Sequence, residues 1–455
     1  MNPSGNRCGG VRGPAGAALV ALCLSALCLG AWAQSSAPVA APLLAASRDR
    51  DSGIYGIGET VGWSIERAAG APEQGYRYLI KANGLQVIGS GELHFAGKVA
   101  RIEVKAARPE MLYVEVSMPD KGAPPMLLGA AVAPERLRPS VPEPADFDRF
   151  WRAKLRLLAA VPVEPVLSTA PSGKAGVEYA TIVMQTIDGA HIHGQIARPV
   201  GSGRHPALLI LQYAGGPYPL QPQWVTDRAA AGWLTLNVEP HDVLPVQPQA
   251  YYDALPAELK KYQTIGREDR DRSYFLRMYL SDYRAIEYLA SRPDWDGHTL
   301  VVMGTSMGGQ QSLCTAALNH RITAVIVNEP SGADANGEAH GRLTGYPNSP
   351  ADNAPALRTA QYFDTVNCAA RIHAPTLVAM GFTDTTAPPA GIWTAFNRIT
   401  APKRAVPMVD SPHNNYATAA QQRPYTDGSQ QWLAALRSGE PLPLVAPHPP
   451  EKLRH

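Results

Sequence analysis

The segment Gly304-Thr305-Ser306-Met307-Gly308 constrains the fold of this chain more than any other. It follows the short apolar run at residues 299–303, which is typical of a buried strand. It precedes residues 310–318, whose apolar side chains recur at helical spacing. Glycines two places on either side of the serine let a strand and a helix approach each other closely around a sharp turn. The segment therefore predicts a strand, a tight turn and a helix in immediate succession.

Strand and helix patterns alternate through most of the chain around this turn. Such alternation is typical of a parallel α/β sheet, and we expect an α/β domain of the hydrolase type over residues 137–438. A helix is predicted at residues 145–155, a long one at 273–291 and a last one after residue 413. Strands are predicted at residues 207–211, 234–238, 300–303, 324–327, 376–380 and 404–408.

Residues from 52 to about 132 follow a different pattern. Apolar and polar residues alternate in short runs that are separated by turn-forming clusters such as Asn83-Gly84. We interpret residues 48–136 as a small antiparallel β-sandwich of the immunoglobulin-like kind. Its clearest predicted strands are residues 61–65, 76–80, 100–104 and 112–116.

The two ends of the chain carry no such patterns. Arg7 and Arg12 precede a short apolar stretch and the small-residue sequence Ala31-Trp32-Ala33, which predicts a signal peptide over residues 1–33, cleaved near Ala33. The apolar stretch is shorter than a membrane-spanning helix needs, so we expect export to the periplasm or the medium without a membrane anchor. Residues 34–47 are predicted to be a linker, and residues 439–455 a proline-rich, extended and unpacked tail.

Charge and cysteine content narrow the function further. The 41 basic residues include Arg7 and Arg12, and loss of these two leaves 39 basic residues against 39 acidic ones. A neutral chain lacks the basic footprint of a nucleic-acid-binding protein. Of the five cysteines, only Cys314 and Cys368 would remain after cleavage. They could pair in an oxidising compartment, but we expect a buried free thiol in the helix after Ser306.

Ser306 sits where a nucleophilic serine would be exposed beside a base and backbone N–H donors. In hydrolases with this turn an acid and then a histidine follow the serine along the chain. Asp384 comes just after the predicted strand 376–380, and His413 lies in a turn-rich loop after residues 404–408. These two are the predicted acid and base. The alternatives that the pattern leaves open are His340, His320, His241 and Asp364.

Several segments besides the Ser306 turn resemble the acetyl xylan esterase and cephalosporin C deacetylase family of carbohydrate esterases. The resemblance runs from about residue 144 to residue 435, and it implies an α/β-hydrolase fold with a serine, an acid and a histidine at the site. The N-terminal sandwich is additional to the compact members of that family. The matching segments begin at Pro144-Ala-Asp-Phe, Arg284-Ala-Ile-Glu, Pro293-Asp-Trp-Asp, Gly381-Phe-Thr-Asp and Ala395-Phe-Asn-Arg.

The resemblance also implies roles for single residues. Ser306 corresponds to the nucleophile, Asp384 to the acid and His413 to the base. Leu211-Gln-Tyr-Ala resembles the family loop whose tyrosine N–H holds the oxyanion, so Tyr213 and Met307 are implied as backbone donors. The family usually has glutamine where Met307 stands and His-Gly where Leu211-Gln212 stands. Pocket polarity and substrate choice are expected to differ accordingly, and Gln212 is a candidate substrate contact.

Other polar residues near the predicted strand ends could also touch substrate. Glu329 and Asp334 follow the strand after Ser306, and either could meet a sugar hydroxyl, although solvated loop carboxylates are the favoured interpretation. The long segment 240–272 could cover the site. His191-Ile-His193 places two imidazoles on one strand face, as a metal site would, but the sequence indicates no third ligand and favours a plain hairpin strand.

Three functions remain compatible with these observations. The leading hypothesis is an exported serine esterase that removes acetyl or other short acyl groups from a carbohydrate or a similar small ester, with no metal or organic cofactor. A serine peptidase of the prolyl-peptidase type shares the turn, although its usual β-propeller is missing. A catalytically silent carbohydrate-binding protein would use the sandwich instead. The sequence does not indicate an oligomeric state.

Overall fold

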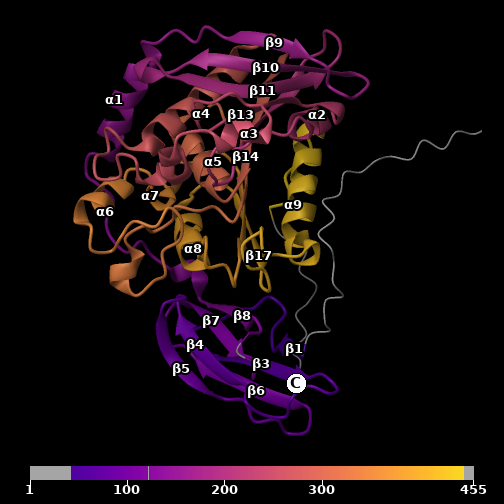
Figure 1. Ribbon diagram of the computed structural model, residues 1–455, viewed down its shortest axis with the longest axis vertical. Coiled ribbons are helices and arrows are strands. Elements are labelled where there is room, and N and C mark those ends of the chain that lie inside the picture. Colours follow the sequence, from indigo (N-terminus) through magenta and orange to yellow (C-terminus); the bar gives the residue numbers. More distant parts are fainter. Residues whose placement is uncertain (1–42, 121, 445–455) are drawn as a thin grey trace, which may run out of the picture. The chain divides into compact units, whose positions relative to one another are not determined.

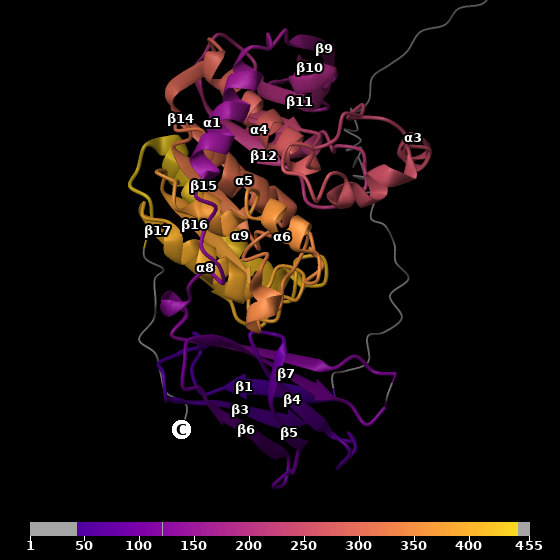
Figure 2. The same ribbon diagram turned by 90° about the vertical axis from the view of Figure 1, so that its left-hand side faces the viewer.

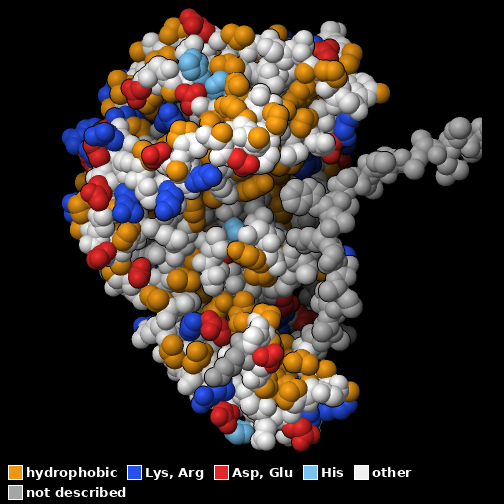
Figure 3. Space-filling view, in the orientation of Figure 1, with side chains coloured by type: hydrophobic (Ala, Val, Ile, Leu, Met, Phe, Trp, Pro, Cys, Tyr) orange, Lys and Arg blue, Asp and Glu red, His pale blue; other side chains and the backbone are white. Residues whose placement is uncertain are grey.

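The computed structural model describes residues 43–120 and 122–444 (Figure 1). The predicted signal peptide, the first part of the predicted linker and the end of the proline-rich tail lie outside the described residues. Within the described part, no helix has the length and the apolar character required to cross a bilayer. Acidic and basic side chains are interspersed over the face in Figure 3, in keeping with the balanced charge of the chain.

A nine-stranded sheet forms the centre of the larger domain. Its strands from β12 to β17 run parallel, and an antiparallel meander lies at the other edge. The predicted α/β class is therefore confirmed. The spatial order is β17 (Lys403–Met408), β16 (Thr376–Gly381), β15 (Ala324–Asn328), β14 (Trp295–Thr305), β12 (His205–Leu211), β13 (Leu234–Val238), β11 (His191–Pro199), β10 (Val177–Gln185) and β9 (Val166–Ala170).

Helices cover both faces of this sheet because alternate strand residues point to opposite faces. In β14, Leu300 and Val302 belong to one core cluster, whereas Val301 and Met303 belong to another. Figure 1 shows α2 and α9 on one side of the parallel strands and α4, α5 and α8 on the other. The helices are α1 (Phe147–Ala159), α2 (Gln223–Ala230), α3 (Gln249–Asp253), α4 (Tyr274–Ser291), α5 (Met307–Leu318), α6 (Ala354–Ala360), α7 (Thr365–Ala369), α8 (Pro389–Arg398) and α9 (Ala419–Ser438).

The predicted strands and helices of this domain are present, with small differences at their ends. The long segment that follows β13 contains α3 and a 3₁₀ stretch (Ala257–Thr264), and Figure 2 shows α3 standing out from the sheet. The antiparallel strands β9 and β10 were not among the sequence predictions. All five residues of β9 are exposed, so this strand lacks the alternating apolar pattern of a half-buried strand, whereas β10 has buried residues at mostly alternate positions that the prediction did not use.

Two sheets near the N-terminus share a second core. One sheet has the order β1-β3-β6 and the other the order β2-β8-β7-β4-β5. Inward side chains such as Trp63, Ile102 and Leu112 fill the space between them. This is the strand order of an immunoglobulin-like sandwich, as predicted. The strands are β1 (Leu44–Arg48), β2 (Ile54–Tyr55), β3 (Thr60–Arg67), β4 (Arg77–Ala82), β5 (Gln86–Glu92), β6 (Val99–Lys105), β7 (Glu110–Ser117) and β8 (Met126–Val132).

The sandwich is continuous with the core of the larger domain. Met111 and Ala131 belong to the same buried cluster as Phe382 and Val409. A Cβ atom on Gly129 would lie 2.6 Å from Cβ of Phe382, so only glycine allows this approach. The backbone N–H of Leu343 also donates to the carbonyl oxygen of Asn83 at 2.9 Å. The sandwich thus packs directly on the loop that contains Asp384.

Two predicted boundaries need correction. β1 begins at Leu44, so it lies in the segment expected to be linker, where its pairing with β3 satisfies the backbone. At the other end, Leu442 and Pro443 of the predicted unpacked tail contact the larger domain, and Leu442 packs on a buried cluster of that domain. The carbonyl oxygen of Pro443 accepts hydrogen bonds from Arg404 and from the indole of Trp432.

The expected free thiol in α5 is wrong. Cys314 in α5 and Cys368 in α7 form a disulfide, with their Cα atoms 5.0 Å apart. The sequence separates the two cysteines by 54 residues and gives no sign that α7 returns to pack against α5. Local pattern could not predict the pairing, because it depends on this tertiary contact.

We predict that replacing both cysteines by alanine will lower the free energy of unfolding by about 4 kcal/mol, the entropic effect of opening a loop of this length. Urea unfolding of the oxidised protein and of the double variant measures the difference. A reducing agent should shift the wild-type midpoint and leave that of the double variant unchanged. Equal shifts in both proteins would contradict the prediction.

Candidate active site

Ser306 occupies a strained turn between β14 and α5. Its backbone adopts φ 57° and ψ −120°, a region that residues with a side chain rarely enter. A Cβ atom on Gly304 would lie 2.3 Å from the carbonyl carbon of Gly308, and one on Gly308 would lie 2.3 Å from the carbonyl oxygen of Leu211. The two glycines therefore make the turn possible. The N–H of Ser306 donates to Asn328 at the end of β15 and holds the turn against the sheet.

Ser306, His413 and Asp384 form a continuous hydrogen-bonded row. Nε2 of His413 lies 3.0 Å from Oγ of Ser306, and Nδ1 lies 2.7 Å from Oδ2 of Asp384. All three residues are at most 5% exposed. The three residues come from the ends of β14, β16 and β17, whose carboxyl ends meet at one edge of the sheet. The alternatives do not join this row: Asp364 accepts backbone hydrogen bonds near α7, and His241 contacts Tyr274.

The loop after β16 fixes the carboxylate of Asp384. Its Oδ1 accepts hydrogen bonds from the backbone N–H groups of Thr386 and Ala387 at 2.7 and 2.8 Å, which leaves Oδ2 for the imidazole. Burial lowers the pKa of His413, but the hydrogen bond and charge of Asp384 and the charge of Glu329 outweigh it, so the pKa lies above its ordinary value. Asp384 therefore stabilises the imidazolium form.

Glu329 is not the solvated loop carboxylate that the sequence favoured. It is completely buried, and its Oε2 lies 3.6 Å from Nδ1 of His413. The carboxylate accepts hydrogen bonds from the N–H of Asn414 at 2.7 Å and from the side chain of Gln422 at 2.8 Å. It therefore holds the loop that contains His413 and has no surface for a substrate. Burial, together with the charge of Asp384, raises the pKa of Glu329 to about 7.

Asp334 and Gln212 also have protein partners in place of the predicted substrate. Asp334 is 5% exposed and pairs with Arg342 at 2.8 Å and with Ser140, so it is neither solvated nor free for a ligand. The side-chain oxygen of Gln212 accepts a hydrogen bond from Tyr218 at 2.8 Å, although Gln212 borders a pocket. The carboxylate of Asp334 and the side-chain oxygen of Gln212 therefore have structural partners.

A glutamine that the sequence did not single out joins the two loops beside Ser306. Nε2 of Gln311, in α5, donates to the carbonyl oxygens of Gln212 at 3.0 Å and Met307 at 3.3 Å. In a trans peptide the carbonyl and the following N–H point in opposite directions, so a fixed carbonyl of Gln212 also fixes the N–H of Tyr213. The only available signal was the position of Gln311, one helical turn after Met307 in α5.

Met307 is buried in an aromatic environment supplied by the long segment after β13. The hydroxyl of Tyr262 lies 2.8 Å from its sulfur, and the hydroxyl of Tyr346 lies 3.5 Å away. Those two hydroxyls also contact each other at 2.5 Å. The sequence suggested that residues 240–272 could cover the site, and Tyr262 is the residue through which this segment reaches the turn.

These elements define a class of protein. A mostly parallel sheet whose central strand ends in a serine turn, with an acid and a histidine after the later strands, is an α/β-hydrolase. Residues 135–431 match the acetyl xylan esterase (AXE1) family model, which covers more than half of the chain. The chain belongs to this family, and the resemblance stated from the sequence is confirmed.

Individual relatives agree with this assignment. Acetyl esterase Axe7A of Xylanibacter ruminicola is 32% identical over 282 residues, or 60% of this chain. The chain spans 64% of the length of that curated relative. The acetyl xylan esterase from Paenibacillus sp. R4 aligns with a TM-score of 0.57, 23% identity and coverage of 67% of this chain and 98% of its own. Acetyl xylan esterase 1 from Thermoanaerobacterium sp. JW/SL YS485 aligns with a TM-score of 0.55 and 22% identity. That alignment covers 67% of this chain and 97% of the other. The two structures share the fold.

We predict that Glu329→Gln will flatten the pH dependence of stability. The folded state raises the pKa of Glu329 from 4.5 to about 7, so its contribution is complete below pH 4.5 and is lost as the pH rises towards 7. Relative to the variant, the wild type should lose on the order of 3 kcal/mol across this window.

Urea unfolding at a series of pH values between 4.5 and 8 measures this difference. Gln422→Ala is the matched control, because it removes a hydrogen bond to Glu329 and leaves the carboxyl group in place. It should lower stability and retain a fall in stability as the pH rises, shifted to higher pH because the hydrogen bond that is lost lowers the pKa of Glu329. Parallel pH profiles for the wild type and Glu329→Gln would show that Glu329 does not titrate in this range.

Proposed function

We propose that this protein is an exported serine esterase that removes acetyl or other short acyl groups from carbohydrate esters. The observation that carries the proposal is the hydrogen-bonded row from Ser306 through His413 to Asp384 at the strained turn. Membership of the acetyl xylan esterase family supports the ester and the acetyl group. The coverage of the curated relative is partial, so both activity and substrate are part of the proposal.

The proposed reaction has two halves. Nε2 of His413 takes the proton of Ser306 as Oγ attacks the ester carbonyl, and Asp384 stabilises the resulting imidazolium. Collapse of the tetrahedral intermediate transfers the proton to the departing sugar oxygen and leaves an acyl group on Ser306. Water, deprotonated by His413, then attacks the acyl group and releases the carboxylic acid. The Nε2–Oγ distance of 3.0 Å suits the first proton transfer without rearrangement.

The negative charge of the intermediate would be held by two backbone N–H groups, those of Tyr213 and Met307. Met307 is the first residue of α5, so its N–H lies at the positive end of a helix. The contact between the carbonyl of Leu211 and Gly308 brings the loop of Tyr213 beside this helix end. Gln311 then fixes the orientation of the peptide bond that carries the Tyr213 N–H.

A pocket of about 460 Å³ beside this loop is the proposed place for part of the substrate. This volume suits a small ligand rather than a polymer. The ring of Tyr213 is 45% exposed, stacks on Tyr218 at 4.9 Å and meets Trp224 edge-on. Exposed aromatic rings offer faces to sugar rings, which favours an acylated sugar or a short oligosaccharide.

Export rests on two observations. The N-terminal sequence has the charged, apolar and small-residue regions of a signal peptide, ending near Ala33. The disulfide between Cys314 and Cys368 fits an oxidising compartment, where such bonds persist. Both point to the periplasm or the medium as the place where the enzyme works.

We predict that Ser306→Ala will lower kcat for 4-nitrophenyl acetate by about 10⁴-fold or more, because no other group can form the acyl-enzyme. Ser312→Ala is the matched control. This buried serine lies in the same helix, donates to Gly308, and should retain activity within a few-fold. A fluorophosphonate should label the wild type and the control but not Ser306→Ala. Undiminished turnover by Ser306→Ala would refute the proposed nucleophile, and cleavage of peptides in preference to acetylated sugars would refute the esterase assignment.

We predict that Gln311→Met will lower kcat by about 10-fold to 100-fold with little change in KM, because a misoriented Tyr213 N–H stabilises the transition state less. Gln310→Met is the control, since Gln310 is equally buried in the same helix but contacts Ser331 instead of the Tyr213 loop. A rise in KM with unchanged kcat would place Gln311 in ground-state binding and contradict its proposed role.

A further inference from the structure

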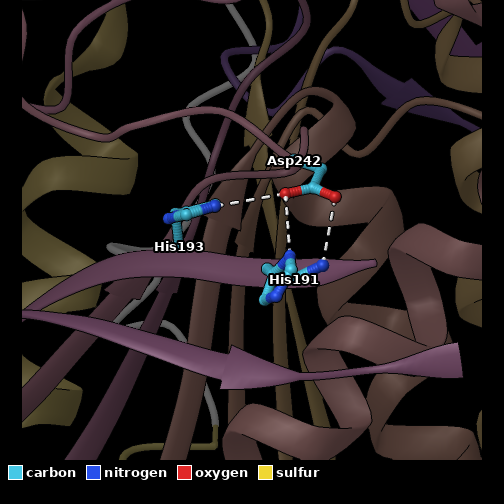
Figure 4. A group of neighbouring side chains, drawn as sticks. All are labelled: His191, His193 and Asp242. Carbon is cyan, nitrogen blue, oxygen red and sulfur yellow. Dashed lines mark hydrogen bonds and ion pairs between the residues drawn. The ribbon is translucent and has the colours of Figure 1, made fainter. Parts of the chain in front are cut away.

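Three side chains with metal-ligand chemistry meet outside the active-site group, at the start of β11. His191 and His193 are two residues apart on that strand and so project from one face of it. Asp242 comes from the segment after β13, 49 residues beyond His193. Figure 4 shows the carboxylate of Asp242 placed between the two imidazole rings. Asp242 is the third partner that the sequence did not indicate.

The distances within this cluster fit a bound metal ion. Oδ1 of Asp242 lies 3.1 Å from Nε2 of His193 and 3.9 Å from Nδ1 of His191. One ligand atom from each residue falls within 4.8 Å of the other two. In a tetrahedral zinc site with bonds near 2.1 Å, ligand atoms are separated by about 3.4 Å. The two measured distances lie on either side of that value, so small side-chain rotations would complete three positions of a tetrahedron.

One side of the cluster is buried in the protein, and the other side is open to solvent. The side chains of His193 and Asp242 are 13% and 28% exposed, and that of His191 is 42% exposed. In the space-filling view, histidine side chains reach the surface close to an acidic one in the upper part of the face (Figure 3). A metal could therefore enter from solvent and keep a water as its fourth ligand.

The backbone already organises this cluster. The N–H of His191 donates to Oδ2 of Asp242 at 3.1 Å, which leaves Oδ1 towards the rings. Within the described residues, Nδ1 of His193 is buried and makes no hydrogen bond, so Asp242 is the partner that orients this ring. A carboxylate fixed by the backbone and an imidazole with no competing partner are available to an ion.

Other histidines in the described chain, outside the active site, belong to no group of three potential ligands. His298 lies 3.5 Å from Asp296 on an exposed turn, and His320 and His373 face each other with ring centroids 4.7 Å apart. The other group of three potential ligands found in the described residues is Glu329, Asp384 and His413 of the active site. The cluster on β11 is therefore the candidate outside the active site.

We propose that His191, His193 and Asp242 bind a divalent transition-metal ion of the zinc class. Two imidazoles and one carboxylate suit Zn²⁺ better than Ca²⁺ or Mg²⁺, which prefer oxygen ligands. The ion would join β11 to the beginning of the segment after β13. It has no part in the ester chemistry, and the site does not depend on the proposed function.

The position of Asp242 gives this site a consequence for the active site. The adjacent His241 is buried, its Nδ1 contacts the hydroxyl of Tyr274 at 2.7 Å, and its ring packs edge-on against Tyr262. Tyr262 in turn contacts the sulfur of Met307, next to Ser306. An ion that anchors Asp242 therefore anchors the start of the segment that covers the turn. We expect the ion to stabilise the folded position of this segment.

The test is zinc binding to the full chain after treatment with a chelator. Calorimetric titration with ZnCl₂ should give one saturable site per chain, and Zn²⁺ should raise the melting temperature through preferential binding to the folded state. His193→Ala and Asp242→Asn should each weaken binding at least about tenfold and remove most of the thermal shift. Asp242→Asn keeps the size of the side chain and an oxygen that can accept from the N–H of His191.

Two controls separate this site from its competitors. The double variant His320→Ala/His373→Ala removes another pair of neighbouring histidines, and Asp384→Asn removes a carboxylate from the active-site group. Both should bind Zn²⁺ with unchanged stoichiometry and affinity. Absence of saturable binding to the wild type would overturn the proposal. The proposal would also be overturned if a control variant lost Zn²⁺ binding while His193→Ala and Asp242→Asn kept it. Near-ultraviolet circular dichroism establishes first that these variants are folded.

Discussion

The close approach of the Leu211 carbonyl to the backbone of Gly308 is the constraint on which the active site depends. It brings the end of β12 against the start of α5, where any side chain at position 308 would force the two apart. The strained serine, the helix end behind it and the neighbouring tyrosine loop all take their positions from this contact. The nine-stranded sheet supplies the rigidity that maintains the strain, since β12 and β14 are central neighbours in it.

A second layer of polar groups supports the hydrogen-bonded row of Ser306, His413 and Asp384. Asp384 is held by two backbone N–H groups, the loop of His413 by Glu329, and the loop of Tyr213 by Gln311. Each of these supporting bonds is buried or partly buried, so each is costly to lose and each restricts motion. Two carboxyl groups close to one imidazole would repel each other if both were charged. The raised pKa of Glu329 relieves that conflict on the acidic side of about pH 7.

Sequence patterns predicted the fold, and they singled out the serine, the acid and the histidine of the proposed site, because both depend on local or ordered signals. The Gly304 to Gly308 pattern, the strands around residues 234 and 376, and the chain order of serine, acid and histidine can each be recognised in a short window. Partners brought together by tertiary folding could not be recognised in this way. Cys368, Asp242 and Gln422 lie 54, 49 and 93 residues from Cys314, His193 and Glu329. The burial of Glu329 and Asp334 could not be recognised either, because Gln422 and Ser140, which hold them, are distant in sequence.

The sandwich packs on the loop that contains Asp384, so it is a structural part of the hydrolase domain rather than a separate attachment. Gly129 lies against Phe382, two residues before Asp384, and Tyr113 borders the same small cavity as Asp384. A sandwich attached by a tether could be exchanged or lost during evolution without effect on the hydrolase. This sandwich covers apolar surface beside the loop of Asp384. A substitution at the contact in either domain must therefore be matched by a substitution in the other. The two domains are therefore expected to be inherited together, as one evolutionary unit.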